Sequence, residues 1–241
     1  MTTNERVGPR RYALIDVLRA CALGLMVCFH FCFDLTYFQL AGFDFYNDPF
    51  WIYSRIVILS AFLVLVGASL WLSHESGIDF KKAWRRVLVI VANAALVSVA
   101  TYAMFGGRWI FFGVLHFIAI ASILGLPLVR HRLLALGVGC VCLWAGSLSN
   151  AIFDQPWLRW VGFMTHKPGT EDYVPLMPWF GVVATGIFLG PLLKHVSVAW
   201  NPRSSGWRLA AGAGRHTLLV YMVHQPILIG LLKLYLTAAR S

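Results

Sequence analysis

Charged residues are scarce in this chain of 241 residues, where they make up 12% of the sequence. A soluble protein of similar length carries about twice that share. Hydrophobic residues make up 59%, which leaves too little polar surface to coat a water-soluble globule. Most of the chain must therefore have lipid as its solvent, and a soluble fold is excluded.

The chain also lacks a basic face, although its formal net charge is +10. Its lysines and arginines stand in short clusters between apolar runs, as loop charges of membrane proteins do, so nucleic-acid binding is not expected. The five cysteines show no zinc-finger spacing and are expected to pack inside helices. No small-x-small cleavage site follows the first apolar run, which we therefore interpret as a retained span.

Several apolar runs have the length of roughly 17 to 25 residues that a membrane-spanning helix needs. They cover residues 14–38, 50–73, 87–104, 109–128, 132–150, 178–196 and 216–236. Helices are the default for such runs because backbone groups cannot stay unpaired in lipid. The sequence therefore predicts an all-α, polytopic integral membrane helical bundle with about seven spans, which forms a single domain over residues 1–241.

Loop charges predict how this bundle is oriented. A cytoplasmic N-terminus places most basic loop residues on the inner side, as the positive-inside rule requires. The inner set is Arg6, Arg10, Arg11, Lys81, Lys82, Arg85, Arg86, Arg130, Arg132, Lys194, Arg203, Arg208 and Arg215, and the outer set is Arg108, Arg159, Lys167, Lys233 and Arg240. We expect a cytoplasmic tail at 1–12, an outer loop at 150–177 and a cytoplasmic loop at 197–214.

The first apolar run carries a polar stripe along one side. At 100° per residue, its members project into a sector of about 60°. They are Asp16, Arg19, His30, Asp34 and Tyr37. Charged residues inside a span almost always face the bundle interior or a wet cavity. We therefore expect this helix to line a cavity across most of the membrane, with Asp16 and Arg19 at the cytoplasmic mouth.

His30 and Asp34 are spaced so that the carboxylate is expected to reach the imidazole and make it a general base. Other spans bring further polar groups to a comparable depth, namely Arg55, His116, His224 and Gln225. Arg55 is expected to neutralise Asp34 or to bind an anionic substrate. No two of the histidines share a helix at metal-ligand spacing, so no metal is expected.

Four motifs follow one another along the chain. They are Ile15-Asp16-Val17-Leu18-Arg19 with His30-Phe31-x-Phe33-Asp34-Leu35, Gly113-Val114-Leu115-His116, Pro175-Leu176-Met177-Pro178-Trp179-Phe180-Gly181, and Gly214-Arg215-His216-Thr217 through His224-Gln225-Pro226. This series resembles the catalytic-domain family of heparan-α-glucosaminide N-acetyltransferase, and most closely its short bacterial members. The resemblance covers nearly the whole chain.

The resemblance implies a transmembrane acyltransferase in a bacterial inner (cytoplasmic) membrane. Such an enzyme moves an acetyl or other acyl group from cytoplasmic acetyl-CoA to a sugar or glycan on the outer side, by O- or N-acetyl transfer. The chain is much shorter than the animal member of the family, and His30 stands where that member has an asparagine. The acceptor of the animal member is therefore not assigned to this chain.

Roles for the candidate residues follow from this chemistry. Asp16, Arg19 and Arg215, with Arg130 or Arg132, are expected to hold the donor phosphates at the cytoplasmic mouth. His30, oriented by Asp34, is expected to take a proton from the acceptor, and His116 or Gln225 to donate to the oxyanion. His224 completes the catalytic set, and Arg55, Trp179 and Gln225 are expected to bind substrate. The sequence is also compatible with a covalent acyl-histidine intermediate in place of direct transfer.

Other functions also fit the polar stripe. A transporter or flippase of a small anionic or lipid-linked solute would use such a stripe for translocation. A structural subunit would not need a base beside a carboxylate at this depth. The sequence is compatible with a homo-oligomer and does not specify the acceptor.

Overall fold

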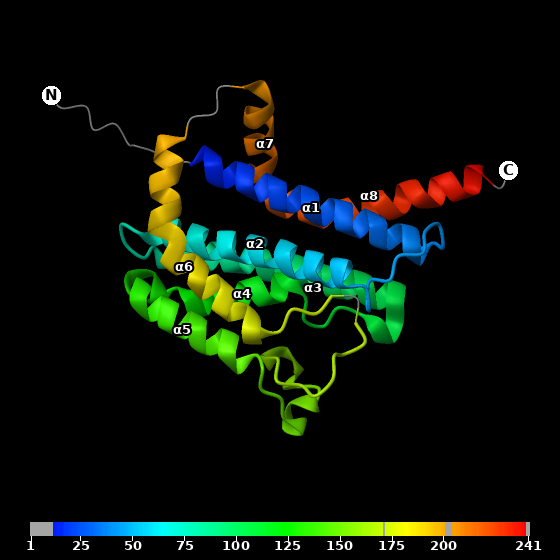
Figure 1. The fold of residues 1–241 in the computed structure, drawn as a ribbon, viewed down its shortest axis with the longest axis horizontal. Coiled ribbons are helices and arrows are strands. Elements are labelled where there is room, and N and C mark those ends of the chain that lie inside the picture. The colour runs from blue at the N-terminus through cyan, green and yellow to red at the C-terminus, as the bar shows by residue number, and fades with distance from the viewer. Residues whose placement is uncertain (1–11, 171, 201–203, 240–241) are drawn as a thin grey trace. The chain divides into compact units, whose positions relative to one another are not determined.

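A computed structural model describes residues 12–170, 172–200 and 204–239 (Figure 1). Every regular element in these ranges is a helix, which confirms the all-α prediction. The predicted tail at 1–12 lies outside the described residues except for Tyr12. The same holds for the predicted loop residues Arg203 and Arg240.

The α-helices are α1 (Ala13–Tyr37), α2 (Pro49–His74), α3 (Phe80–Phe105), α4 (Val114–Gly125), α5 (Arg132–Ala145), α6 (Leu176–Ala199), α7 (Ser205–Arg215) and α8 (Thr217–Ala238). Within the described ranges, five helical segments are long and apolar enough to cross a membrane: α1, α2, α3 with its extension to Arg108, α6 and α8. The chain is therefore a polytopic integral membrane protein. The runs 109–128 and 132–150 form α4 and α5, helices of 12 and 14 residues, so a count of seven spans is not confirmed.

Side-chain caps decide where several helices begin. Asp48 Oδ1 accepts from the Phe50 N–H at 2.8 Å at the start of α2, and Asp79 Oδ1 accepts from the Lys82 N–H at 3.0 Å at the start of α3. Ser204 caps α7 in the same way by accepting from the Trp207 N–H at 3.4 Å. These caps satisfy N–H groups that have no partner in the first helical turn. They explain why α3 begins before its apolar run and why the predicted loop 197–214 contains a helix.

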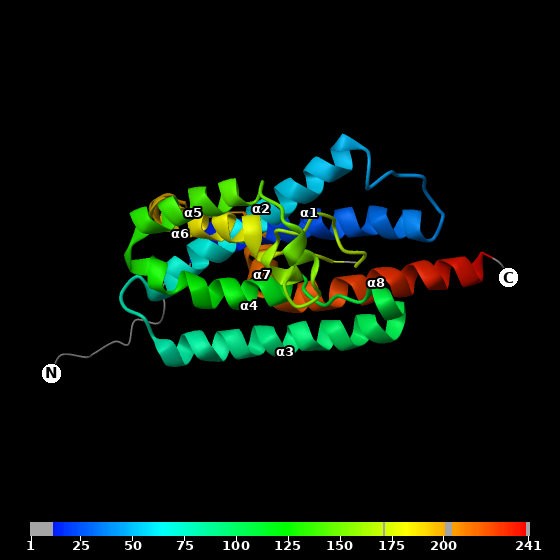
Figure 2. The ribbon, with the colours of Figure 1, turned by 90° about the horizontal axis from the view of Figure 1, so that it is seen from below.

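The described residues form two compact units. One contains α1, α7 and α8 and extends to Arg55 and from Leu192 onward, whereas the other spans Ile56–Pro191. In the first unit, α8 lies beside α1, and α7 also packs on α1 (Figure 2). In the second unit, α3 and α4 lie side by side. Residues 49–55 of α2 and residues 192–199 of α6 belong to the first unit, and the rest of both helices belongs to the second.

The predicted outer loop at 150–177 is folded by side-chain hydrogen bonds. Asp154 accepts from the Thr165 N–H at 2.9 Å and the Thr165 hydroxyl at 2.7 Å, and these bonds lower the pKa of the Asp154 carboxyl. Tyr173 donates its hydroxyl to the Arg159 carbonyl oxygen at 2.6 Å, and burial raises the pKa of Tyr173 to about 12. This loop is therefore a structured connection between α5 and α6.

Glycines allow α2 and α6 to pack backbone against backbone in the second unit. A Cβ on Gly67 would overlap the carbonyl oxygen of Val183, and a Cβ on Gly186 would overlap that of Val64. Small residues at such contacts are what permits close helix approach in membranes. The contact is reciprocal, so neither helix can yield without moving the other.

Replacement of Gly186 by alanine is expected to destabilise the protein by about 2 to 3 kcal/mol, the upper range for overpacking. The added Cβ meets backbone rather than a movable side chain. Gly137→Ala on α5 is the matched control, because nothing lies within 4 Å of its added Cβ. Thermal unfolding of the purified protein in detergent measures both variants. Equal unfolding midpoints for the two would contradict the close packing of α2 on α6.

Candidate functional site

The beginning of α1 carries an ion-pair cluster. Arg19 Nη1 donates to Asp16 Oδ1 at 2.8 Å, and Arg215 Nε lies 3.7 Å from Asp16 Oδ2. Asp16 is 6% exposed, whereas the Arg215 side chain is 47% exposed. One buried carboxylate thus holds two guanidinium groups. Because the Arg215 side chain is half exposed, its guanidinium N–H groups can also bind an anion. The structure therefore brings together three of the residues predicted at the mouth.

A glycine positions this cluster. Gly214 of α7 packs directly on α1, because a Cβ there would overlap the carbonyl oxygen of Asp16. Thr217 Oγ1 donates to the Gly214 carbonyl oxygen at 2.6 Å where α7 meets α8. The close approach of Gly214 sets the next residue, Arg215, beside Asp16.

Two histidines face each other where α1 and α8 run side by side. The ring centroids of His30 and His224 lie 5.1 Å apart. His30 Nδ1 lies 3.0 Å from the Met26 carbonyl oxygen, and His224 Nδ1 lies 2.6 Å from the Tyr221 carbonyl oxygen. A carbonyl oxygen accepts hydrogen bonds and cannot donate one, so each Nδ1 carries a proton, and in the neutral ring each Nε2 then keeps a lone pair. Each ring in its neutral form can therefore accept a proton at Nε2.

Asp34 bonds to α8 rather than to His30. Gln225 Nε2 donates to Asp34 Oδ1 at 2.9 Å, and Asp34 is 3% exposed. The predicted hydrogen bond between Asp34 and His30 is wrong, because the His30 ring is turned toward the Met26 carbonyl on its own helix. The carboxylate instead links α1 to the residue that follows His224.

Three buried side-chain atoms in this cluster have no hydrogen-bond partner among the described residues. They are Asp34 Oδ2, His224 Nε2 and Gln225 Oε1. The carboxylate and amide oxygens are acceptors, and so is the deprotonated ring nitrogen. A buried acceptor without a donor costs about 1–3 kcal/mol, so such atoms call for a partner. These three acceptor atoms suit a ligand that has several N–H or O–H donor groups.

His116 lies in the second unit at the start of α4. The Gly113 N–H donates to His116 Nδ1 at 3.3 Å, and His116 Nε2 lies 3.1 Å from Ser98 Oγ. The Ser98 hydroxyl itself donates to the Ile110 carbonyl oxygen at 2.7 Å, so it accepts from the ring. Both ring nitrogens of His116 therefore have partners, which favours a capping role over a catalytic one.

His116→Ala is accordingly expected to destabilise the protein by about 1–2 kcal/mol through loss of the cap. His131→Ala is the control, because His131 precedes α5 without a side-chain cap bond. Chemical unfolding in detergent compares the two variants. Full stability of the His116 variant would contradict the capping role and leave a catalytic role as the better reading.

The remaining predicted site residues are Arg55 on α2 and three residues of the second unit. Arg55 is exposed on α2 and forms no ion pair within the part of the chain that the structure describes, so its predicted pairing with Asp34 is not formed. Arg130, Arg132 and Trp179 belong to the second unit, where both arginines are exposed and Trp179 is half-buried on α6. Their binding roles stay predictions.

The helices and the buried polar clusters define a class of protein, an integral membrane protein with buried polar side chains between helices long enough to span the bilayer. A family model described as heparan-alpha-glucosaminide N-acetyltransferase, catalytic, matches residues 11–226 of the chain. The chain therefore belongs to this family of membrane acetyltransferases, which confirms the resemblance seen in its motifs. Comparison with curated proteins and with solved structures gives no match.

Proposed function

We propose that the protein transfers an acetyl group from cytoplasmic acetyl-CoA to a hydroxyl or amino group of a saccharide on the outer side of the membrane. The observation that carries the proposal is the set of lone-pair atoms between α1 and α8, in a chain of this acetyltransferase family. Acyl transfer to a hydroxyl or amine needs a base to remove a proton from the acceptor. His30 and His224 each offer an Nε2 lone pair for that task.

The arginine cluster supports a donor with phosphate groups. Arg19 and Arg215 are held by the same carboxylate, and guanidinium groups bind phosphates through charge-assisted hydrogen bonds. From Arg19 to His30 the helix rises about 16 Å. An extended pantetheine arm can bridge that distance and present its thioester beside the histidine pair.

The proposed step is a direct transfer. His30 Nε2 takes the proton as the acceptor oxygen or nitrogen attacks the thioester carbonyl carbon. A C–O or C–N bond forms, the C–S bond breaks, and the CoA thiolate leaves and takes up the proton. His224 Nε2, Asp34 Oδ2 and Gln225 Oε1 accept hydrogen bonds from other donor groups of the saccharide, which orients it.

Arg19→Ala is expected to raise KM for acetyl-CoA by about tenfold or more, because a hydrogen bond to a charged group contributes about 1.5–3 kcal/mol. The assay uses purified protein in detergent, measures free CoA thiol, and supplies a panel of glucosamine and glycan acceptors. Lys233→Ala, an exposed cation on α8, is the control and is expected to leave KM unchanged. An unchanged KM for Arg19→Ala would refute its phosphate role. Absence of acceptor-dependent thiol release in wild type would refute the proposed function.

Translocation of a solute is the second candidate function. Pro226 lies inside α8 directly after His224 and Gln225. Interrupted helices with polar residues form the solute sites of many transporters. The two candidates differ in whether the acetyl group leaves CoA.

A further inference from the structure

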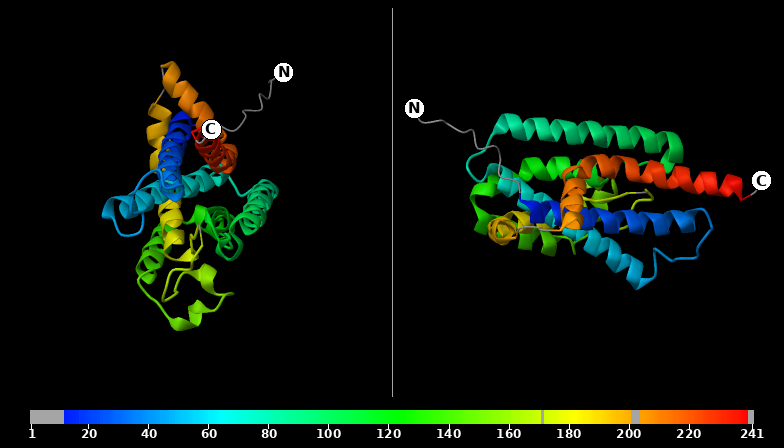
Figure 3. Two further views of the ribbon diagram at one scale, coloured as in Figure 1. Left: turned by 90° about the vertical axis from the view of Figure 1, so that its right-hand side faces the viewer. Right: turned by 90° about the horizontal axis from the view of Figure 1, so that it is seen from above.

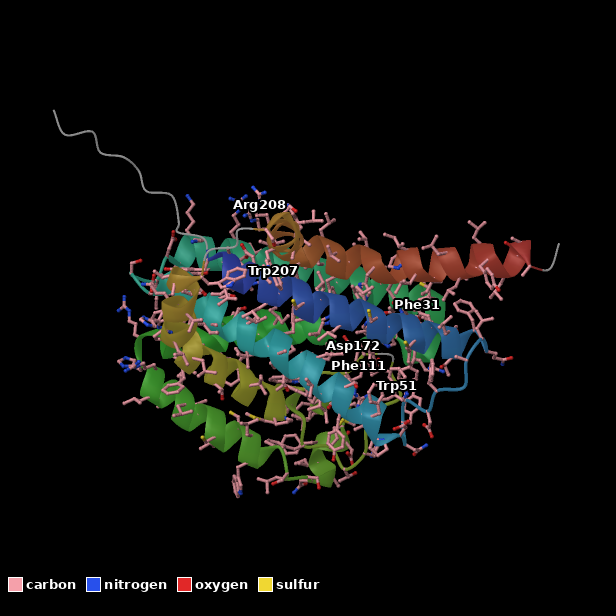
Figure 4. The ribbon with its side chains drawn as sticks, turned by 45° about the horizontal axis from the view of Figure 1, so that its top comes forward. Phe31, Trp51, Phe111, Asp172, Trp207 and Arg208 are labelled. Atoms are coloured by element: carbon pink, nitrogen blue, oxygen red, sulfur yellow. The ribbon has the colours of Figure 1, made fainter. Side chains whose placement is uncertain are left out.

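Helix α7 has an exposed aromatic and basic face that the transfer step above does not use. Trp207 is 48% exposed, and Arg208 is exposed beside it (Figure 4). The Trp207 ring meets the Trp200 ring nearly at a right angle, with centroids 6.0 Å apart and an interplanar angle of 77°. This contact orients the Trp207 ring, and about half of the residue stays exposed to a ligand that could stack on it.

The basic residues of α7 form a row that leads to the ion-pair cluster. Arg208 and Arg215 project within about 20° of each other and lie about 10 Å apart along the helix axis. Helix α7 lies across α1 rather than along it (Figure 3). The row therefore runs from the Asp16 carboxylate, which Arg215 contacts, outward to the turn that carries Trp207.

We propose that this face of α7, formed by Trp207, Arg208 and Arg215, binds the nucleotide end of acyl-CoA. The adenine stacks on Trp207, and Arg208 and Arg215 bind the phosphates. The inference rests on the proposed function and extends the donor site from Arg215 to Arg208 and Trp207 on the same helix. Arg208 has no carboxylate partner among the described residues, so its charge is available to an anion. Bases stack on exposed aromatic rings, and guanidinium groups recognise phosphate.

The geometry of α7 favours a nucleotide over a lipid surface as the occupant of this face. Tryptophan and arginine also occur where helices lie on membranes. Leu209, 78% exposed, offers the apolar side that lipid would cover. Trp207 and Leu209 project about 160° apart, on opposite sides of Arg208. Lipid against Leu209 would therefore not cover Trp207, which is 48% exposed although it shares the side of α7 that carries the buried Ala211 and Gly214.

The inference is tested with two acetyl donors that have the same thioester group, acetyl-CoA and S-acetyl-pantetheine. S-acetyl-pantetheine carries the reacting group of acetyl-CoA without the nucleotide. Trp207→Leu, which keeps an apolar side chain but removes the aromatic face, is expected to lower kcat/KM for acetyl-CoA about tenfold. The value for S-acetyl-pantetheine is expected to stay unchanged. Arg208→Gln is expected to act in the same selective way, and Leu209→Ala is the control that changes neither donor.

An equal loss for both donors in the Trp207 and Arg208 variants would overturn the inference and indicate a structural or lipid-anchoring role. Direct binding gives an independent answer. Adenosine 3′,5′-bisphosphate is expected to quench tryptophan fluorescence of the wild type and not of Trp207→Leu, and equal binding to both would refute the assignment. If the wild type transfers acetyl from neither donor, the proposed function fails, while this binding measurement still decides the role of α7.

Discussion

His30→Gln is expected to lower kcat for acetyl transfer by about 10² to 10⁴-fold, the contribution of a positioned general base. Glutamine preserves a polar side chain at this position but cannot accept a proton. Because the ion-pair cluster that binds the donor lies about 16 Å away along α1, affinity for acetyl-CoA is expected to stay the same. Single-turnover measurement of acetyl transfer separates the chemical step from binding.

His224→Gln distinguishes the two histidines of the pair. In our account His224 accepts a hydrogen bond from the acceptor and does not remove the reacting proton. Its loss is therefore expected to reduce transfer by about tenfold, the effect of one hydrogen bond. A larger loss in His224→Gln than in His30→Gln would reverse the two roles. Near-normal single turnover in both variants would show that neither ring is the base.

Gly214→Ala is expected to raise KM for acetyl-CoA by about tenfold and to destabilise the protein by about 3 kcal/mol. The added Cβ would overlap the carbonyl oxygen of Asp16, which is backbone and cannot rotate away. Helix α7 must therefore move off α1 and carry Arg215 away from Asp16. The arginines of α7, Arg208 and Arg215, would then lie farther from Asp16 and Arg19 on α1.

Gly212→Ala provides the control on the same helix. Nothing lies within 4 Å of a Cβ at this position, so donor affinity and stability are expected to be unchanged or slightly raised. Steady-state kinetics with acetyl-CoA and thermal unfolding measure both variants. If Gly214→Ala behaves like Gly212→Ala, then α7 does not depend on its contact with α1.

The sequence predicts the long helices well because their apolar runs are uninterrupted. Helix α1 (Ala13–Tyr37) differs from the predicted run 14–38 by one residue at each end. The runs at 109–128 and 132–150 appear longer than α4 and α5 because hydropathy alone does not register the caps and turns that end a helix. Helix α7 is missed since its composition of glycine, serine and arginine suggests a loop. The helical spacing of Trp207, Ala211 and Gly214 on one side was the available signal.

The site residues were predicted unequally well. Spacing along one helix correctly gathers Asp16 and Arg19, since residues three apart share a face. The same rule suggests a bond between His30 and Asp34, yet each has a different partner in the fold. A backbone carbonyl of the preceding turn takes the His30 Nδ1 proton, and Gln225 arrives from α8 to bond Asp34. Contacts between helices far apart in sequence decide such choices, and a single sequence does not encode them locally.

The most direct test of the central claim follows the two ends of the donor separately across a membrane. Proteoliposomes receive acetyl-CoA labelled with ¹⁴C on the acetyl group and ³H on the adenine, supplied to the cytoplasmic face, with a saccharide acceptor inside. We expect ¹⁴C-labelled acceptor in the lumen while ³H stays outside. With His30→Gln, we expect both labels to stay outside. Entry of both labels, or of neither, would contradict transmembrane acetyl transfer, and joint entry would favour the transporter.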